Sequence, residues 1–72
     1  MNLKKLDLHG QKHHELAIKV ENYVLLNQQS LPLEIVCGKS QKIIEIVTNV
    51  LDEIDCEYYI IKDFGTIIVR KI

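Results

Sequence analysis

The 72-residue chain has few of the residues that mark unusual architectures, with one Pro, three Gly, two Cys and no Trp. The single Pro and a hydrophobic content of 47% exclude a collagen-like or disordered chain. Cys37 and Cys56 are too few for a disulfide framework, so we expect free thiols in a reducing compartment.

The sequence is also too short for a second domain, and it lacks long apolar runs and an excess of either charge. Residues 1–72 suffice for a single minimal domain. No apolar run approaches the roughly 18 residues that span a bilayer, and the first residues lead into a strand pattern rather than a signal peptide. We therefore expect a cytoplasmic protein with no membrane partner. A net charge of −1 means that any nucleic-acid binding must come from local segregation of charge.

The first half of the chain changes from strand to helix periodicity. Residues 6–9 alternate, which directs Leu6 and Leu8 inward and leaves Asp7 and His9 together on the other face. From about residue 13, apolar residues at helical spacing predict an amphipathic helix that ends near residues 27–30.

Two apolar residues of this helix, Ile18 and Leu25, lie opposite its buried side, with Leu26 nearby. A helix packed on a sheet buries only one side, so these residues predict an exposed apolar stripe. We expect a homodimer or a protein partner to bind through Ile18 and Leu25. The alternative is that isolated surface Ile and Leu residues have no partner.

The second half predicts a strand over residues 33–37, a helix capped by Ser40, and two strands over 58–61 and 67–72 joined by a short hairpin connection. The element order β-α-β-α-β-β favours a two-layer α/β sandwich. Right-handed crossovers that step the same way place both helices on one face of a mixed four-stranded sheet, with three parallel strands and the last antiparallel.

The carboxyl ends of the parallel strands are expected to form one edge, where ligands bind in open α/β sheets. Acidic residues gather instead on or just after the second helix. Basic and small residues in the loops at this edge predict a nucleic-acid site formed by Gly10, Lys12, Gly38, Lys39, Ser40, Lys42, Lys62 and Phe64.

Three motifs occur in a consistent order along the chain. LDLHG at residues 6–10, followed by a helix, resembles the opening motif of the Smr (small MutS-related) domain family. CGKS at residues 37–40 is similar to that family's glycine-containing turn before helix two, and GTIIV at residues 65–69 is similar to its last-strand pattern. The resemblance covers nearly the whole chain, with departures at Cys37, Ser40 and Glu45.

The resemblance implies a nicking endonuclease that acts on structured DNA or RNA, with Asp7 and His9 as the catalytic pair. The alternative is a non-catalytic adaptor that binds nucleic acid or the ribosome. The chemistry is coherent, because histidine exchanges protons near neutral pH, a neighbouring carboxylate orients the imidazole, and helix-start amides beside Lys39 and Ser40 bind phosphate. Asp7 and His9 could instead only cap the strand end.

Other patterns are weaker. GKS at residues 38–40 matches the tail of a P-loop, but Leu33 stands where that motif needs Gly. The histidines and Cys37 have no recognised ligand spacing, so we predict no metal and no cofactor. Phe64 either stacks on a base or fixes its loop to the core.

Overall fold

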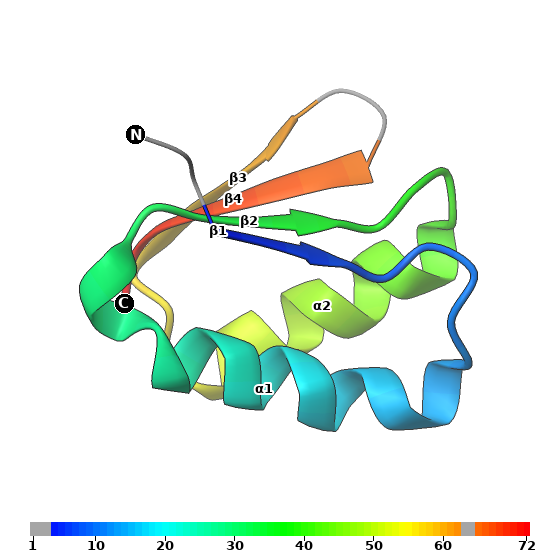
Figure 1. Ribbon diagram of the computed structural model, residues 1–72, viewed down its shortest axis with the longest axis horizontal. Coiled ribbons are helices and arrows are strands. Elements are labelled where there is room, and N and C mark those ends of the chain that lie inside the picture. The colour runs from blue at the N-terminus through cyan, green and yellow to red at the C-terminus, as the bar shows by residue number, and fades with distance from the viewer. Residues whose placement is uncertain (1–3, 63–64) are drawn as a thin grey trace.

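The computed structural model describes residues 4–62 and 65–72. The expected element order is confirmed, and the two helices cover the same face of one four-stranded sheet (Figure 1). Short 3-10 helices, η1 (His13–Glu15) and η2 (Gln28–Ser30), flank the first α-helix. The main elements are β1 (Lys4–Asp7), α1 (Leu16–Leu26), β2 (Leu33–Val36), α2 (Gln41–Glu53), β3 (Tyr58–Lys62) and β4 (Thr66–Lys71).

The strand order is β1-β2-β4-β3, which corrects the expected sheet. The prediction of three parallel strands is wrong, since only β1 pairs with β2 in parallel and β4 is antiparallel to both of its neighbours. β4 lies between β2 and β3, and its residues Ile67, Ile68 and Val69 are all buried, Ile68 on the face away from the helices by its cross-strand neighbours. β3 leaves Tyr58 and Ile61 exposed and takes the edge.

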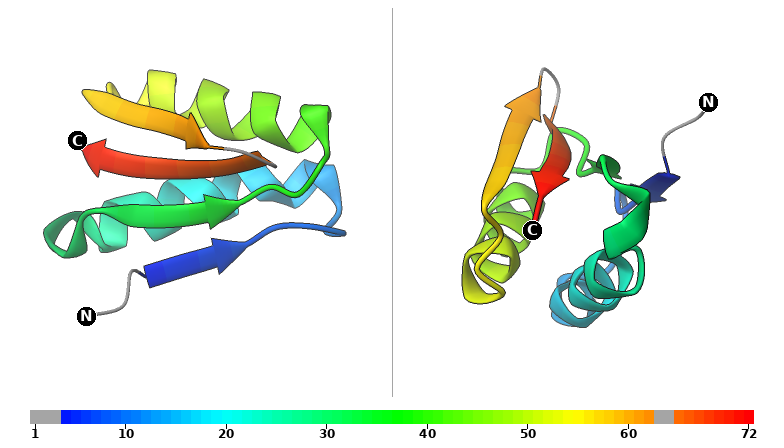
Figure 2. Two further views of the ribbon diagram at one scale, coloured as in Figure 1. Left: turned by 90° about the horizontal axis from the view of Figure 1, so that it is seen from above. Right: turned by 90° about the vertical axis from the view of Figure 1, so that its left-hand side faces the viewer.

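The β3–β4 hairpin nevertheless keeps the strand ends together. β3 and β2 are both antiparallel to β4, so β1, β2 and β3 all end at the same side of the sheet (Figure 2). The loops after β1 and β2 therefore lie at one edge with the start of β4. We call this side the strand-end edge.

The core lies between the sheet and the two helices. α1 buries apolar side chains at spacings of four residues and α2 at spacings of three and four, and each fully buried side chain contributes about 1.5–3 kcal/mol. Ser40 caps α2 as expected, because its Oγ accepts a hydrogen bond from Ile43 N at 3.2 Å. The buried residues from the sheet and its extensions are Leu8, Leu33, Ile35, Cys37, Ile67, Ile68 and Val69, and those from the helices are Leu16, Val20, Val24, Ile43, Val47, Val50 and Leu51.

The first helix differs from its prediction at its start. Residues His13–Glu15 form a 3-10 turn, since no side chain caps that turn, and the α-helix begins at Leu16. The apolar stripe is confirmed as exposed, with Ile18 at 66% and Leu25 at 39%. Neither helix in the described part of the chain is long and apolar enough to cross a membrane.

Gly65 occupies a position that admits no side chain. Its φ is +79°, and a Cβ there would lie 1.8 Å from the carbonyl oxygen of Gly38. Gly10 has a similar φ of +75° but open space around it.

We expect Gly10→Ala to lower the free energy of unfolding by about 1–2 kcal/mol from backbone strain alone. Gly65→Ala should cost about 2 kcal/mol more from the overlap. Urea denaturation compares the two variants, and equal losses would contradict this packing.

Both cysteines are free, which confirms the expected thiols. Burial raises the pKa of the Cys37 thiol to about 11. The unfolded thiol ionises at lower pH, so stability should be complete below about pH 9 and fall between about pH 9 and 11. Urea denaturation across this range should show a smaller decrease in the free energy of unfolding for Cys37→Ala than for the unaltered protein.

A thiol reagent at neutral pH should modify Cys56 before Cys37, because Cys37 is buried. Equal rates of modification would contradict this difference in burial.

Candidate functional site

Three chain segments meet at the strand-end edge. Leu8 N donates to Val36 O and Cys37 N donates to Gly65 O, both at 2.8 Å, so sheet pairing continues past the ends of the strands. A Cβ on Gly38 would lie only 3.1 Å from the Cβ of His9. The segment after β1, the turn after β2 and the start of β4 are therefore in direct contact.

Asp7 and His9 form a hydrogen-bonded pair on this edge. Asp7 Oδ1 accepts from the backbone amide of His9 at 3.1 Å and lies 2.5 Å from His9 Nδ1. The strand alternation that buries Leu8 puts both side chains on its other side, as predicted. The side chains are exposed, with relative accessibilities of 50% for Asp7 and 70% for His9.

The pair has a defined proton chemistry. The side-chain hydrogen bond to His9, followed by the backbone one, lowers the pKa of the Asp7 carboxyl. The carboxylate form is the stabilised one, so the pair is intact above the ordinary Asp pKa and weakens as the pH falls through the lowered value. In the described part of the chain, no hydrogen bond to His9 Nε2 is present, and the His9 side chain is 70% exposed. Asp7 thus orients the ring and leaves the second nitrogen available.

Two further side chains hold this segment in place. Gln11 Nε2 donates to the backbone oxygen of Asp7 at 2.9 Å, and Lys19 Nζ on α1 donates to Gln11 Oε1 at 2.7 Å. These contacts anchor the loop to the helix and bring an additional cation near the edge. Sequence reasoning missed both roles, although the four-residue spacing of Asp7 and Gln11 was a usable signal.

The start of α2 supplies free backbone donors beside the pair. The first helical hydrogen bond runs from Ile44 N to Ser40 O at 3.1 Å, so the amides of Gln41 and Lys42 precede any helical acceptor. Lys39 is exposed in the turn before them. Lys42 Nζ lies 3.9 Å from Glu45 Oε1, which partly neutralises it.

The remaining predicted site residues are more dispersed. Gly10 and Lys12 are exposed in the loop after β1. Lys62 pairs with Thr66, which pairs with Val36 and so with Asp7 across the sheet. Three strand spacings separate Lys62 from Asp7 by about 14 Å. Phe64 lies outside the described residues.

The other histidines do not join the pair. His14 Nε2 lies 3.3 Å from Glu15 Oε2 on η1, and both side chains are exposed. Across residues 4–62 and 65–72, no group of three or more His, Cys, Asp or Glu side chains is placed to hold a metal ion.

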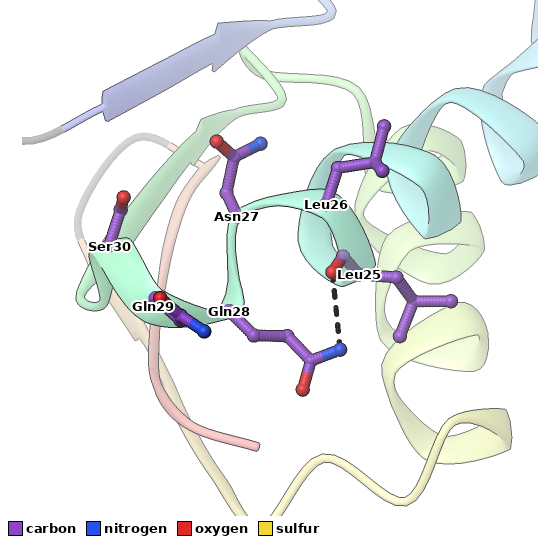
Figure 3. A pocket seen from close by; sticks show the side chains of 6 residues that line it. All are labelled: Leu25, Leu26, Asn27, Gln28, Gln29 and Ser30. Carbon is purple, nitrogen blue, oxygen red and sulfur yellow. Dashed lines mark hydrogen bonds between the residues drawn. The ribbon is translucent and has the colours of Figure 1, made fainter.

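An open hollow of about 470 Å³ lies away from this edge, where α1 ends and η2 follows (Figure 3). Leu25 and Leu26 line it together with residues 27–30, and Gln28 Nε2 donates to Leu25 O at 3.1 Å. It has no connection with Asp7 or His9, since α1 starts near the strand-end edge and ends at the opposite end (Figure 1).

No protein-family model, curated protein or solved structure matches this chain. Function must therefore be argued from the site itself.

Proposed function

We propose that the protein is a cytoplasmic, Smr-like nucleic-acid-binding domain that nicks structured DNA or RNA. The observation that carries this proposal is the exposed, hydrogen-bonded pair of Asp7 and His9 beside the Gly38 turn at the start of α2. A phosphodiester within a folded nucleic acid can contact only groups that protrude from the protein surface. An exposed pair therefore fits a substrate of this size.

The pair has the groups that phosphodiester cleavage requires. His9 Nε2 accepts the proton of a water or a ribose 2′-OH as that oxygen attacks phosphorus, and the bond from phosphorus to the leaving oxygen breaks. Asp7 holds His9 Nδ1 and stabilises the resulting imidazolium. Proton return to the leaving oxygen restores the neutral ring.

Donors at the start of α2 support the same step. The Gln41 and Lys42 amides and the Lys39 side chain supply positive potential for phosphate oxygens. Lys12 and Lys62 extend this potential along the edge. Nucleic acid is thus expected to bind across the strand-end edge despite the net charge of −1.

The alternative is a non-catalytic adaptor that binds nucleic acid or the ribosome through the same edge. The apolar stripe of Ile18, Leu25 and Leu26 favours this alternative, because it leaves a surface for a protein partner on α1. The adaptor needs the charge of the edge but not the imidazole of His9.

Cleavage separates the two functions. We expect the protein to nick supercoiled plasmid or a structured RNA, and His9→Ala to lower the rate by 100-fold or more through loss of the proton acceptor, within the range of about 10² to 10⁴ for general acid–base groups. Asp7→Asn should lower it less, since the ring remains. Gel analysis of time courses measures both rates.

His14→Ala is the matched control, because His14 is also an exposed histidine beside a carboxylate. It should leave the rate unchanged. Equal nicking by His9→Ala and the unaltered protein would contradict a catalytic role for the pair. Binding without any cleavage would support the adaptor.

Binding should depend steeply on salt. If Lys12, Lys39, Lys42 and Lys62 all contact phosphates, the slope of log affinity against log salt should be about −3 to −4. Lys39→Glu with Lys42→Glu should abolish binding in a fluorescence titration. Lys4→Glu with Lys71→Glu makes the same charge change at the opposite end of the sheet and should reduce binding little (Figure 2). Equal effects of the two double variants would exclude the strand-end edge as the site.

A further inference from the structure

We propose that β3 is a dimerisation edge, which pairs antiparallel with β3 of a second copy of this chain. β3 pairs only with β4 and ends the described sheet, so its outer backbone groups have no strand partner. Unpaired strand edges are templates for pairing with another chain, and natural edges usually block this with charge. This inference does not rest on the Asp7–His9 pair, because β1, which positions Asp7, is the other edge of the sheet, although Lys62 belongs both to β3 and to the proposed nucleic-acid surface.

The two edges differ in their protection. β1 has charged side chains at three of its four positions, Lys4, Lys5 and Asp7. β3 has the sequence YYIIK, in which the only charged residue is the last. Tyr58 is 52% exposed and Ile61 is 54% exposed, although both belong to a sheet strand. β3 is therefore the more apolar and less charged edge, and it is the one open to pairing.

The sequence of β3 is complementary to itself. A two-fold axis perpendicular to the sheet keeps every side chain on its own face, so each residue pairs only with a residue of the same face. The register centred on Ile60 satisfies this condition and pairs all five residues of the strand. It places Ile60 opposite Ile60, Tyr59 opposite Ile61, and Tyr58 opposite Lys62.

Each of these pairs is favourable. Tyr59 against Ile61 is an aromatic and β-branched pair on the helix face, and it occurs twice by symmetry. Tyr58 presents its ring to the Lys62 ammonium group, an attractive cation–π arrangement. No like charges meet across the strand pair.

The face away from the helices extends this complementarity. Sheet register aligns Lys5, Glu34, Ile68 and Ile60 in one row, which starts with an ion pair of 4.0 Å between Lys5 and Glu34. Ile68 is only 5% exposed, although neither helix of the described residues covers this face. Pairing at Ile60 would join two such rows and enclose the apolar residues between the two ion pairs.

The charges of the helices agree with the same arrangement. A two-fold axis next to β3 makes the two α2 helices run in opposite directions, since α2 lies in the helix layer below β3 (Figure 2). The first turn of one α2, which carries Lys42, then lies toward the last turns of the partner helix, which carry Asp52 and Glu53. The helix dipoles also oppose each other favourably.

Sedimentation velocity from micromolar to millimolar protein tests the dimer. The unaltered chain should shift with concentration from 8.4 kDa toward twice that mass. Ile60→Lys should remain monomeric, because it sets two like charges on the two-fold axis. Ile61→Glu changes an exposed side chain and should also be monomeric, so a folding defect at Ile60 does not leave the question open. Circular dichroism checks the fold of each variant.

A charge-swap experiment tests the register. An equimolar mixture of Ile60→Lys and Ile60→Glu should restore the dimer, since only the register centred on residue 60 brings these two side chains together. Ile18→Glu with Leu25→Lys, on the exposed stripe of α1, is the matched control and should dimerise like the unaltered chain. A strictly monomeric protein at all concentrations, or a dimer lost only in the α1 variant, would overturn the proposal.

Discussion

The contact between Gly65 and the Gly38 carbonyl determines how the strand-end edge is assembled. The overlap that a Cβ would produce, at 1.8 Å from a backbone oxygen, means that the start of β4 lies directly against the β2–α2 turn. The hydrogen bond from Cys37 N to Gly65 O fixes the same junction. Because a Cβ on Gly38 would lie 3.1 Å from the Cβ of His9, the position of the imidazole depends on a junction with Gly65, a glycine that is distant in sequence.

The alternating and helical patterns predicted most of the local structure. The first strand shows a clear alternation of apolar Leu6 and Leu8 with polar Asp7 and His9. The second helix begins after Ser40, a strong helix cap. Both features could be predicted without tertiary information. Strand order was not predictable in this way. The two runs of the hairpin are both rich in β-branched residues, and only their burial in the sheet distinguishes the interior β4 from the edge strand β3.

Side-chain contacts between residues three to eight positions apart account for what sequence reasoning missed at the site. Gln11 binds the backbone of Asp7, and Lys19 reaches Gln11 from α1, eight residues away. The spacing of Asp7 and Gln11 was a usable signal, whereas the contact of Lys19 with Gln11 depends on how α1 packs beside the loop. The same limitation applies to Lys42, whose charge appears free in the sequence but pairs with Glu45 one helical turn later. An exposed ion pair of this kind contributes little to stability but lowers the positive potential at the start of α2.

The helices form a single layer on one face of the sheet, so apolar side chains on the opposite face must be shielded from water by other side chains of the sheet. On that face, cross-strand neighbours replace a second layer, and Ile68 is buried by the side chains around it rather than by a helix. Such protection requires a neighbour on both sides. At the β1 end of the row the Lys5–Glu34 pair provides a charged boundary, whereas at the β3 end Ile60 is the last residue. This asymmetry follows from the position of the hairpin strands. Because β4 lies between β2 and β3, the apolar strand β3 is at the edge of the sheet rather than in its interior.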